Sequence, residues 1–302
     1  MVRLGFIGLG IMGKPMTMNL LKQGYETTVF DINELVVKQL VEEGARGAGS
    51  AKEVAEHSDI IFTMVPNSAH VKSVILDKDG VINGAKDGDI VVDLSSISPD
   101  ISKDIAARLA EHGVHMLDAP VSGGEQGAFD ATLAIMVGGK EEIFQKVKPI
   151  LACMGKDITL VGDHGSGTTA KLANQIIVNV NIAAMAEALA FATKAGIDVG
   201  KMYEAIRGGL AGSAVLDAKV PMILERNFKA GGPVYINSKD LTNVLDTAES
   251  IGMKLPLSGQ VLDMYQELLR DGKKDIDHCG LVQVYEKREN IEVKKVSHDD
   301  KL

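Results

Sequence analysis

The sequence predicts an α/β domain with a mostly parallel sheet, followed by a second domain made of helices. Up to about residue 163, short apolar runs typical of buried strands alternate with helical segments, which is the pattern of a sheet covered by helices on both faces. From Ser166 to Ala195 there is no proline, and Gly167 is the only glycine. A chain of 302 residues has room for about two such domains.

The expected elements of the first domain have recognisable ends. Ser50 begins a capping box with Glu53, and Ser98-Pro99 is a helix start with proline where a missing N–H costs nothing. The second domain would begin with one helix of about 45 Å, which needs burial on several sides. The predicted strands span residues 2–7, 27–30, 59–64, 89–93, 115–118, 133–137 and 157–161, and the first helix spans 14–23.

A glycine-rich turn follows the first strand. Gly8, Gly10 and Gly13 stand between an expected strand and an expected helix, and the second strand ends on Asp31. In this context the glycines allow a tight turn, the close approach of a pyrophosphate and close helix–strand packing. The helix start offers N–H groups to phosphates, and Asp31 can accept hydrogen bonds from a ribose. An ordinary glycine turn is the alternative. The complete context favours a dinucleotide-binding domain over residues 1–163.

The remainder of the chain divides into two further regions. Residues 164–292 are expected to form an all-helical C-terminal domain, punctuated by glycines such as Gly196 and Gly252. Past about Asn290 the sequence turns polar and charged, so we expect a loose tail over residues 293–302.

Bulk composition excludes several classes of protein. The net charge is −9 and no Lys/Arg cluster stands out, which argues against a nucleic-acid surface. We expect no membrane-spanning run and no signal peptide, because polar residues interrupt the apolar stretches and no basic leader is seen. Cys153 and Cys279 are expected to be free thiols in the cytoplasm. His112 and His115 are close in sequence, but no third ligand accompanies them, so no metal site is expected.

Two polar segments end expected strands. Asp93-Leu94-Ser95-Ser96 follows one strand, and ligands of open α/β sheets bind beyond that edge. Asp118 to Gly124 follows another, and its Ser-Gly-Gly turn offers a hydroxyl and backbone N–H groups suited to a carboxylate. Taken alone, the first segment is better explained as a helix cap or turn, and the second is explained equally well as a glycine turn.

A single lysine lies near the start of the long helix. Lys171, Asn174 and Gln175 stand at i, i+3 and i+4 and so share a helix face. Burial would lower the pKa of Lys171 and make proton donation easier near neutrality. A snorkelling lysine is the alternative. Lys239-Asp240 could complete the site or form an adjacent charge pair on an exposed helix start.

Together these segments resemble the β-hydroxyacid dehydrogenase family. The family's motifs match here as Gly8 to Gly13, Asp118 to Gly124 and Gly165 to Asn174, with Lys239-Asp240 downstream. The resemblance covers nearly the whole chain, to about Asn290. It implies a Rossmann-type dinucleotide-binding domain, a long interdomain helix and an all-helical C-terminal domain that supports a homo-oligomer, either a dimer or a tetramer.

One branch of the family is most similar, the tartronate semialdehyde reductases. Lys171 to Gln175, Ala205 to Ser213 and Val215 to Lys219 look like that branch. The 3-hydroxyisobutyrate dehydrogenases usually carry two asparagines where this chain has Asn174-Gln175. The reductase branch usually has an aromatic residue where this chain has Gly232.

The resemblance also implies roles for individual residues. Lys171 is expected to be the catalytic acid/base. The substrate would be bound by Ser122, Gly123 and Gly124 around its carboxylate, with Asn174 and Gln175 beside it. The cofactor would be bound by Gly8, Gly10, Ile11, Met12, Gly13, Asp31, Val65, Pro66, Ser95 and Lys239.

The expected function is NAD-dependent reduction of tartronate semialdehyde (2-hydroxy-3-oxopropionate) to glycerate. NADH is expected to be preferred over NADPH, because Asp31 would repel a 2′-phosphate and Ile32-Asn33 supplies no arginine. The alternatives are a related enzyme acting on succinic or methylmalonate semialdehyde, and a non-catalytic nucleotide-binding protein. Neither nucleic acid, membrane nor metal is expected as a partner.

Overall fold

The computed structural model describes residues 2–295, and these form two compact units divided between Leu172 and Ala173. The division falls within a single helix, α8 (Ser166–Lys194). The first unit is an α/β fold and the second is helical, as the sequence predicts.

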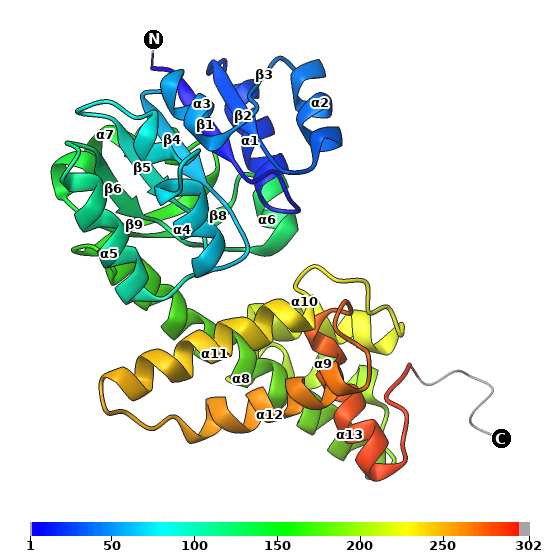
Figure 1. Ribbon diagram of the computed structural model, residues 1–302. Helices are drawn as coiled ribbons and strands as arrows, with labels where there is room; N and C mark the ends of the chain where they lie inside the picture. Colours follow the sequence, from blue (N-terminus) through cyan, green and yellow to red (C-terminus); the bar gives the residue numbers. More distant parts are fainter. Residues whose placement is uncertain (1, 296–302) are drawn as a thin grey trace. The chain divides into compact units, whose positions relative to one another are not determined.

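The α/β unit is built on one sheet whose strands are mostly parallel (Figure 1). Within the described residues the strand order is β3-β2-β1-β4-β5-β6-β8-β7, and β9 pairs with β8. The strands are β1 (Leu4–Ile7), β2 (Thr27–Phe30), β3 (Arg46–Gly47), β4 (Ile60–Thr63), β5 (Ile90–Asp93), β6 (His115–Asp118), β7 (Val121–Ser122), β8 (Leu133–Gly138) and β9 (Gly155–Gly162).

Two strand pairs run antiparallel, and neither was expected from the sequence. β8 pairs antiparallel with β6 and with the two-residue β7. In β7, Ser122 stands opposite Ala134. A strand this short carries no periodicity, which is why hydrophobic patterning could not detect it.

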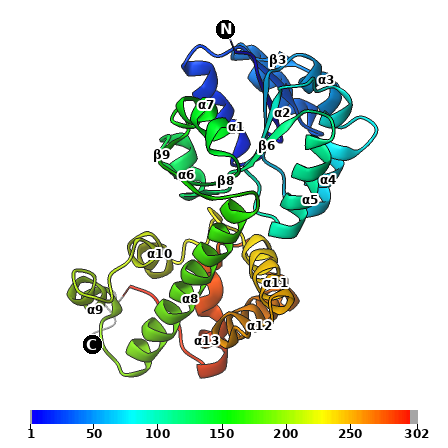
Figure 2. The same ribbon diagram turned by 90° about the vertical axis from the view of Figure 1, so that its left-hand side faces the viewer.

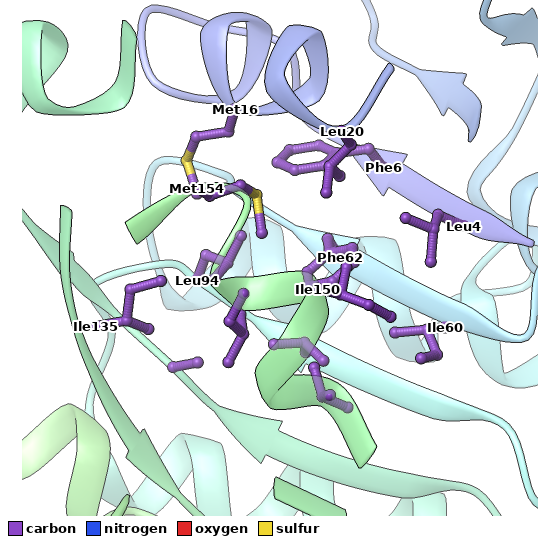
Figure 3. Close-up of a cluster of buried hydrophobic side chains, with 14 of the residues drawn as sticks. Leu4, Phe6, Met16, Leu20, Ile60, Phe62, Leu94, Ile135, Ile150 and Met154 are labelled. Carbon is purple, nitrogen blue, oxygen red and sulfur yellow. The ribbon is translucent and has the colours of Figure 1, made fainter. Parts of the chain in front are cut away.

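Helices cover both faces of the sheet, because alternate strand residues point to opposite faces. Leu4, Phe6 and Phe62 lie in one apolar cluster with side chains of α1 (Gly13–Lys22) and α7 (Glu141–Leu151) (Figure 3). Ile7 and Ile61 point the other way. The remaining helices of this unit are α2 (Glu34–Glu42), α3 (Ala51–Glu56), α4 (Ser68–Leu76), η1 (Val81–Asn83), α5 (Pro99–Ala110) and α6 (Gly124–Phe129).

The helix starts predicted at Ser50 and Ser98 are found, but the side-chain hydrogen bonds at the two starts differ. The Ser50 hydroxyl accepts a hydrogen bond from the Glu53 N–H at 3.1 Å, as the predicted capping box requires, but the Glu53 carboxylate accepts from the Gly49 N–H, one residue before the N-cap. Ser98 occupies the N-cap of α5 with Pro99 after it, but no capping bond from its side chain is present among the described residues.

The helical unit packs around the second part of α8 (Figure 2). Ile182, Ala186 and Leu189 of α8 lie in its apolar core. The other elements are α9 (Val199–Ile206), α10 (Ala214–Leu224), α11 (Val234–Ser250), α12 (Pro256–Arg270), η2 (His278–Leu281) and α13 (Val282–Glu289).

Two expectations bear on this unit. By length and mean hydropathy, α8 could cross a membrane, whereas the sequence was expected to hold no run of that length without polar interruption; Asn174, Gln175 and Asn179 do interrupt it. Core helices pass the same test, and the buried face of α8 fits that explanation. Val293 is fully buried, so the start of the predicted polar tail packs on the unit. Residues 296–302 of that tail lie outside the described residues.

Candidate active site

The turn after β1 requires glycine at two of its three positions. Gly8 has φ +92°, and a Cβ there would lie 2.2 Å from the carbonyl oxygen of Met64. A Cβ on Gly13 would lie 1.9 Å from the Gly8 carbonyl oxygen. At Gly10, by contrast, a Cβ would meet no described atom within 4 Å. Gly8 and Gly13 therefore serve the fold, whereas Gly10 leaves open space where a ligand can approach the backbone.

The start of α1 is prepared for an anion. Met12 occupies its N-cap, and in residues 2–295 no side chain caps it and no acidic residue lies in its first turn. An uncapped helix start presents N–H groups and a partial positive charge. Together with the space at Gly10, this arrangement fits the pyrophosphate of a dinucleotide.

Asp31 is held at the end of β2, beside the glycine turn. Its Oδ2 accepts a hydrogen bond from the Leu9 N–H at 2.6 Å, and its Oδ1 accepts from the Asn33 N–H at 2.8 Å. Ile32 beside it is 94% exposed. The carboxylate is thus fixed in orientation, and its oxygens keep lone pairs for a ribose hydroxyl.

The ends of β4 and β5 are joined by side-chain hydrogen bonds. The buried Ser95 hydroxyl accepts from the Val65 N–H at 3.0 Å. Asp93 Oδ1 accepts from the Thr63 hydroxyl at 2.8 Å and from the Ser95 N–H at 3.1 Å. Val65 and Ser95, both predicted cofactor residues, therefore lie side by side, with Pro66 directly after Val65. Asp93 was predicted only as part of the Asp93–Ser96 segment, without a role of its own, and Thr63 was not predicted.

The Ser122-Gly123-Gly124 turn follows β7. Gly123 has φ +140° and Gly124 has φ +64°, and both glycines are exposed. Successive residues with such dihedrals direct backbone N–H groups into a concavity suited to an anion. The positive φ values also mean that larger residues at Gly123 or Gly124 would strain the backbone.

The start of α8 is closed by a carboxylate. Asp118, at the end of β6, accepts from the Gly165 N–H with Oδ1 and from the Thr168 N–H with Oδ2, both at 2.8 Å. Lys171 follows on the same helix, and only 7% of it is exposed. The alternative of a snorkelling surface lysine is therefore wrong.

In the helical unit, the predicted polar residues form one connected cluster. Asn174 Nδ2 donates to Gln175 Oε1 at 2.9 Å, and Gln175 Nε2 donates to Asp240 Oδ2 at 2.6 Å. Lys239 Nζ lies 3.0 Å from Asp240 Oδ1. Asp240 is buried in α11, so this pair does not lie on an exposed helix start. The sequence analysis considered Lys239-Asp240 as a pair but assigned a role only to Lys239.

Gly232 lies beside a buried histidine. Its N–H donates to Asp277, and a Cβ there would be 3.5 Å from Asn237 Nδ2 and 3.7 Å from His278 Nε2. Burial lowers the pKa of His278 to about 4, so its imidazole is neutral at physiological pH. Gly232 therefore lies beside a charged carboxylate, Asp277, which pairs with Lys219, and a neutral imidazole, where the resemblance leads one to expect an aromatic wall.

Residues 2–295 contain no group of three His, Cys, Asp or Glu side chains that could hold an ion. The His112 ring instead contacts the carbonyl oxygen of Arg108.

Comparisons with known proteins match this architecture. Residues 3–162 match the family model described as the NAD binding domain of 6-phosphogluconate dehydrogenase. Residues 165–285 match the one described as NAD-binding of NADP-dependent 3-hydroxyisobutyrate dehydrogenase. Both descriptions name an NAD-binding domain, so NAD is the cofactor class, and the Gly10 space, the open start of α1 and Asp31 fit it.

Relatives and solved structures are similar over nearly the full length. The chain is 43% identical to 2-hydroxy-3-oxopropionate reductase from Escherichia coli (strain K12), over 94% of this chain and 97% of the relative. It is 37% identical to 2-(hydroxymethyl)glutarate dehydrogenase from Eubacterium barkeri, over 97% of each. The crystal structure of 3-hydroxyisobutyrate dehydrogenase from Salmonella typhimurium aligns with a TM-score of 0.86 at 32% identity, over 94% of this chain and 100% of that one.

Proposed function

This chain belongs to the β-hydroxyacid dehydrogenase family and is an oxidoreductase, and from that premise we propose that it uses NADH to reduce tartronate semialdehyde to glycerate. The observation that carries the proposal is the placement of Lys171. It is buried on α8, directly after the Asp118-bound start of that helix, in the same compact unit as the glycine turn and the Ser122 turn.

The glycine turn and the strand ends would hold the cofactor. Gly10 and the N–H groups of Ile11, Met12 and Gly13 would receive the pyrophosphate, and Asp31 the adenosine ribose. Val65, Pro66 and Ser95 would line the path toward the nicotinamide at the carboxyl ends of β4 and β5, and Lys239 would add a contact. The bound cofactor supplies the hydride.

The Ser122 turn would hold the substrate. Its hydroxyl and the N–H groups of Gly123 and Gly124 suit one carboxylate. Tartronate semialdehyde carries its aldehyde two carbons from that carboxylate, so anchoring the carboxylate also fixes the distance to the reacting carbon. Such positioning lowers the barrier by removing unproductive orientations in advance.

Lys171 would supply the proton. As the aldehyde carbon accepts a hydride, its oxygen becomes an alkoxide, and an ammonium group beside it can donate a proton to form the alcohol of glycerate. Asn174 and Gln175, on the same face of α8, offer amide groups for the substrate hydroxyl. A site that hydrogen-bonds a hydroxyl rejects analogues without one, because its own polar groups are then left unpaired.

A second candidate substrate is a longer acid such as succinic semialdehyde, because Gly232 has no side chain where the reductase branch usually has an aromatic one. The space at this position is limited, since a Cβ there would lie 3.5 Å from Asn237 Nδ2 and 3.7 Å from His278 Nε2. Methylmalonate semialdehyde has the correct length but replaces the hydroxyl with a methyl group. We further propose a cytoplasmic homo-oligomer, a dimer or a tetramer, as implied by the family.

A substrate panel tests the assignment. Tartronate, methylmalonate and succinic semialdehydes are each assayed with NADH and with NADPH, and kcat/KM is compared. We expect the highest value for tartronate semialdehyde with NADH. A higher value for succinic semialdehyde would replace the assignment with the rival in the same family. Nucleotide binding without turnover of any of the three would support a non-catalytic protein.

A further inference from the structure

Two buried aspartates stand next to each other at the carboxyl end of the sheet. Asp93 ends β5 and Asp118 ends β6, and the two are register partners in this parallel strand pair. Both are fully buried. None of the proposed substrate or cofactor contacts uses either side chain, so their presence at this edge needs another explanation.

Burial makes these carboxyl groups costly to the fold. Burial raises the pKa of Asp93 to about 6, against hydrogen bonds from Ser95 and Thr63 that lower it, and the neighbouring Asp118 raises it further. Burial likewise raises the pKa of Asp118, although hydrogen bonds from the Gly165 and Thr168 N–H groups and the charge interaction with His164 lower it. A carboxyl group with a raised pKa destabilises the folded state at neutral pH. Stability alone therefore does not account for either residue.

The hydrogen bonds of the two aspartates lead to different parts of the site. Asp93 binds Thr63 and Ser95, and Ser95 holds the Val65 N–H, so Asp93 fixes the two loops assigned to the cofactor. Asp118 binds the Gly165 and Thr168 N–H groups and so fixes the start of the helix that carries Lys171.

The two carboxyl groups also differ in how they bind. Asp93 accepts both of its hydrogen bonds with Oδ1, and its Oδ2 has no hydrogen-bond partner within residues 2–295. Asp118 uses both oxygens, Oδ1 for Gly165 and Oδ2 for Thr168. An amide has one acceptor oxygen. An asparagine at position 93 can therefore accept both hydrogen bonds with its one oxygen, whereas an asparagine at position 118 can accept only one of the two.

We propose that Asp93 and Asp118 are two positioning residues with separate tasks: Asp93 arranges the cofactor loops, and Asp118 arranges the start of α8 and thereby Lys171. The proposal rests on the proposed function for the assignment of Val65, Ser95 and Lys171. It predicts that the effects of changing the two aspartates separate between cofactor binding and turnover.

The test measures NADH affinity and turnover separately in the full-length enzyme. The Kd for NADH is obtained by fluorescence titration without substrate, and kcat with whichever semialdehyde the wild type turns over fastest. Asp93→Ala leaves a buried hydroxyl and N–H unpaired and should raise the Kd about tenfold or more, with kcat at saturating NADH changed by less than about threefold. Asp118→Ala should lower kcat about tenfold or more and leave the Kd within about twofold.

The asparagine variants distinguish positioning from general structural support. Asp93→Asn should recover the Kd to within about threefold of wild type, whereas Asp118→Asn should stay as slow as Asp118→Ala. Asp89→Ala is the matched control. Asp89 precedes the other end of β5, where it accepts a hydrogen bond from the Lys86 N–H, and its loss should change neither readout.

Several results would overturn the proposal. Equal loss of affinity and turnover in both alanine variants would overturn it, as would recovery by Asp118→Asn. If Asp93→Ala proves too unstable to purify, Thr63→Val removes one donor and keeps the shape. It should raise the Kd with kcat unchanged, and an unchanged Kd would overturn the role of Asp93. Because the Kd needs no substrate, failure of the tartronate semialdehyde assignment is seen separately in the substrate panel.

Discussion

Helices α1 and α8 both begin in the α/β unit next to strands of the same sheet, but the N–H groups of their first turns have different partners. Among the described residues, the start of α1 has no capping side chain, and a Cβ at Gly10 would meet no atom. The start of α8 is occupied by the Asp118 carboxylate, which accepts hydrogen bonds from Gly165 and Thr168.

This difference indicates two roles: the start of α1 is suited to binding an anion, and the start of α8 is suited to holding the helix in place. A helix start carries partial positive charge and N–H groups that need acceptors. At α1 the N-cap residue supplies no side-chain acceptor and the Lys14 N–H bonds the Gly10 carbonyl oxygen, so an external phosphate can bind the N–H groups that remain. At α8 the protein supplies its own anion, and the helix is thereby fixed for the residue that follows, Lys171. Substitutions at the two helix starts test whether their roles differ in this way.

The largest expected effect is at Lys171. If the closed start of α8 serves to position a proton donor, Lys171→Met should lower kcat by about two to four orders of magnitude while NADH still binds. Lys194→Met, on the exposed last turn of the same helix, is the control and should keep wild-type kcat. Stopped-flow and steady-state assays measure the rates. A Lys171→Met enzyme with more than about a tenth of wild-type kcat would remove the lysine from the mechanism.

The open start of α1 is tested by two glycine variants. Gly10→Ala fills space without touching the protein, so NADH affinity should fall about tenfold with the unfolding free energy unchanged. Gly13→Ala would collide with the Gly8 carbonyl oxygen and should lower the free energy of unfolding by about 1–3 kcal/mol. Titration with NADH and urea denaturation give the two quantities. Normal NADH affinity in Gly10→Ala would show that the phosphates bind elsewhere.

Cofactor choice should depend on the carboxylate beside the α1 turn. In the proposed cofactor placement Asp31 faces the adenosine ribose, so a 2′-phosphate would meet like-charge repulsion there. Replacing Asp31 with Ser and Ile32 with Arg should shift the NADH-to-NADPH ratio of kcat/KM about tenfold toward NADPH. A wild-type enzyme that already works faster with NADPH would refute the placement of Asp31.

The smallest effect concerns stability and pH. The folded-state pKa of Asp93, about 6, is above the unfolded value of 3.8, so the folded state binds this proton more tightly. The contribution of Asp93 to stability is therefore greatest at low pH and is lost as the pH rises through about 6. Asp93→Asn removes this cost, so its stability relative to wild type should improve by about 1–2 kcal/mol between pH 5 and pH 8. Urea denaturation at both pH values checks this, and a constant difference would contradict the assignment.

The sequence alone predicted those features of the candidate site that depend on residues close together in the chain. Gly8, Gly13 and Asp31 were predictable because each is required by its own turn or strand end within one βαβ unit. The bonds from Asp118 to Thr168 and from Asp240 to Gln175 join residues 50 and 65 positions apart, and no local pattern encodes them. Asp93 was noticed only as part of a turn, because its role depends on the register between β4, β5 and β6.

The most direct test of the central claim follows the hydride itself. The enzyme is mixed with tartronate semialdehyde and NADH deuterated at C4 on the transferred side, and the product is examined by NMR. We expect glycerate with one deuterium on C3 for each NADH consumed, and no such product from Lys171→Met on the same time scale. Oxidation of NADH without C3-deuterated glycerate, or no oxidation by the wild-type enzyme, would contradict the proposed reaction.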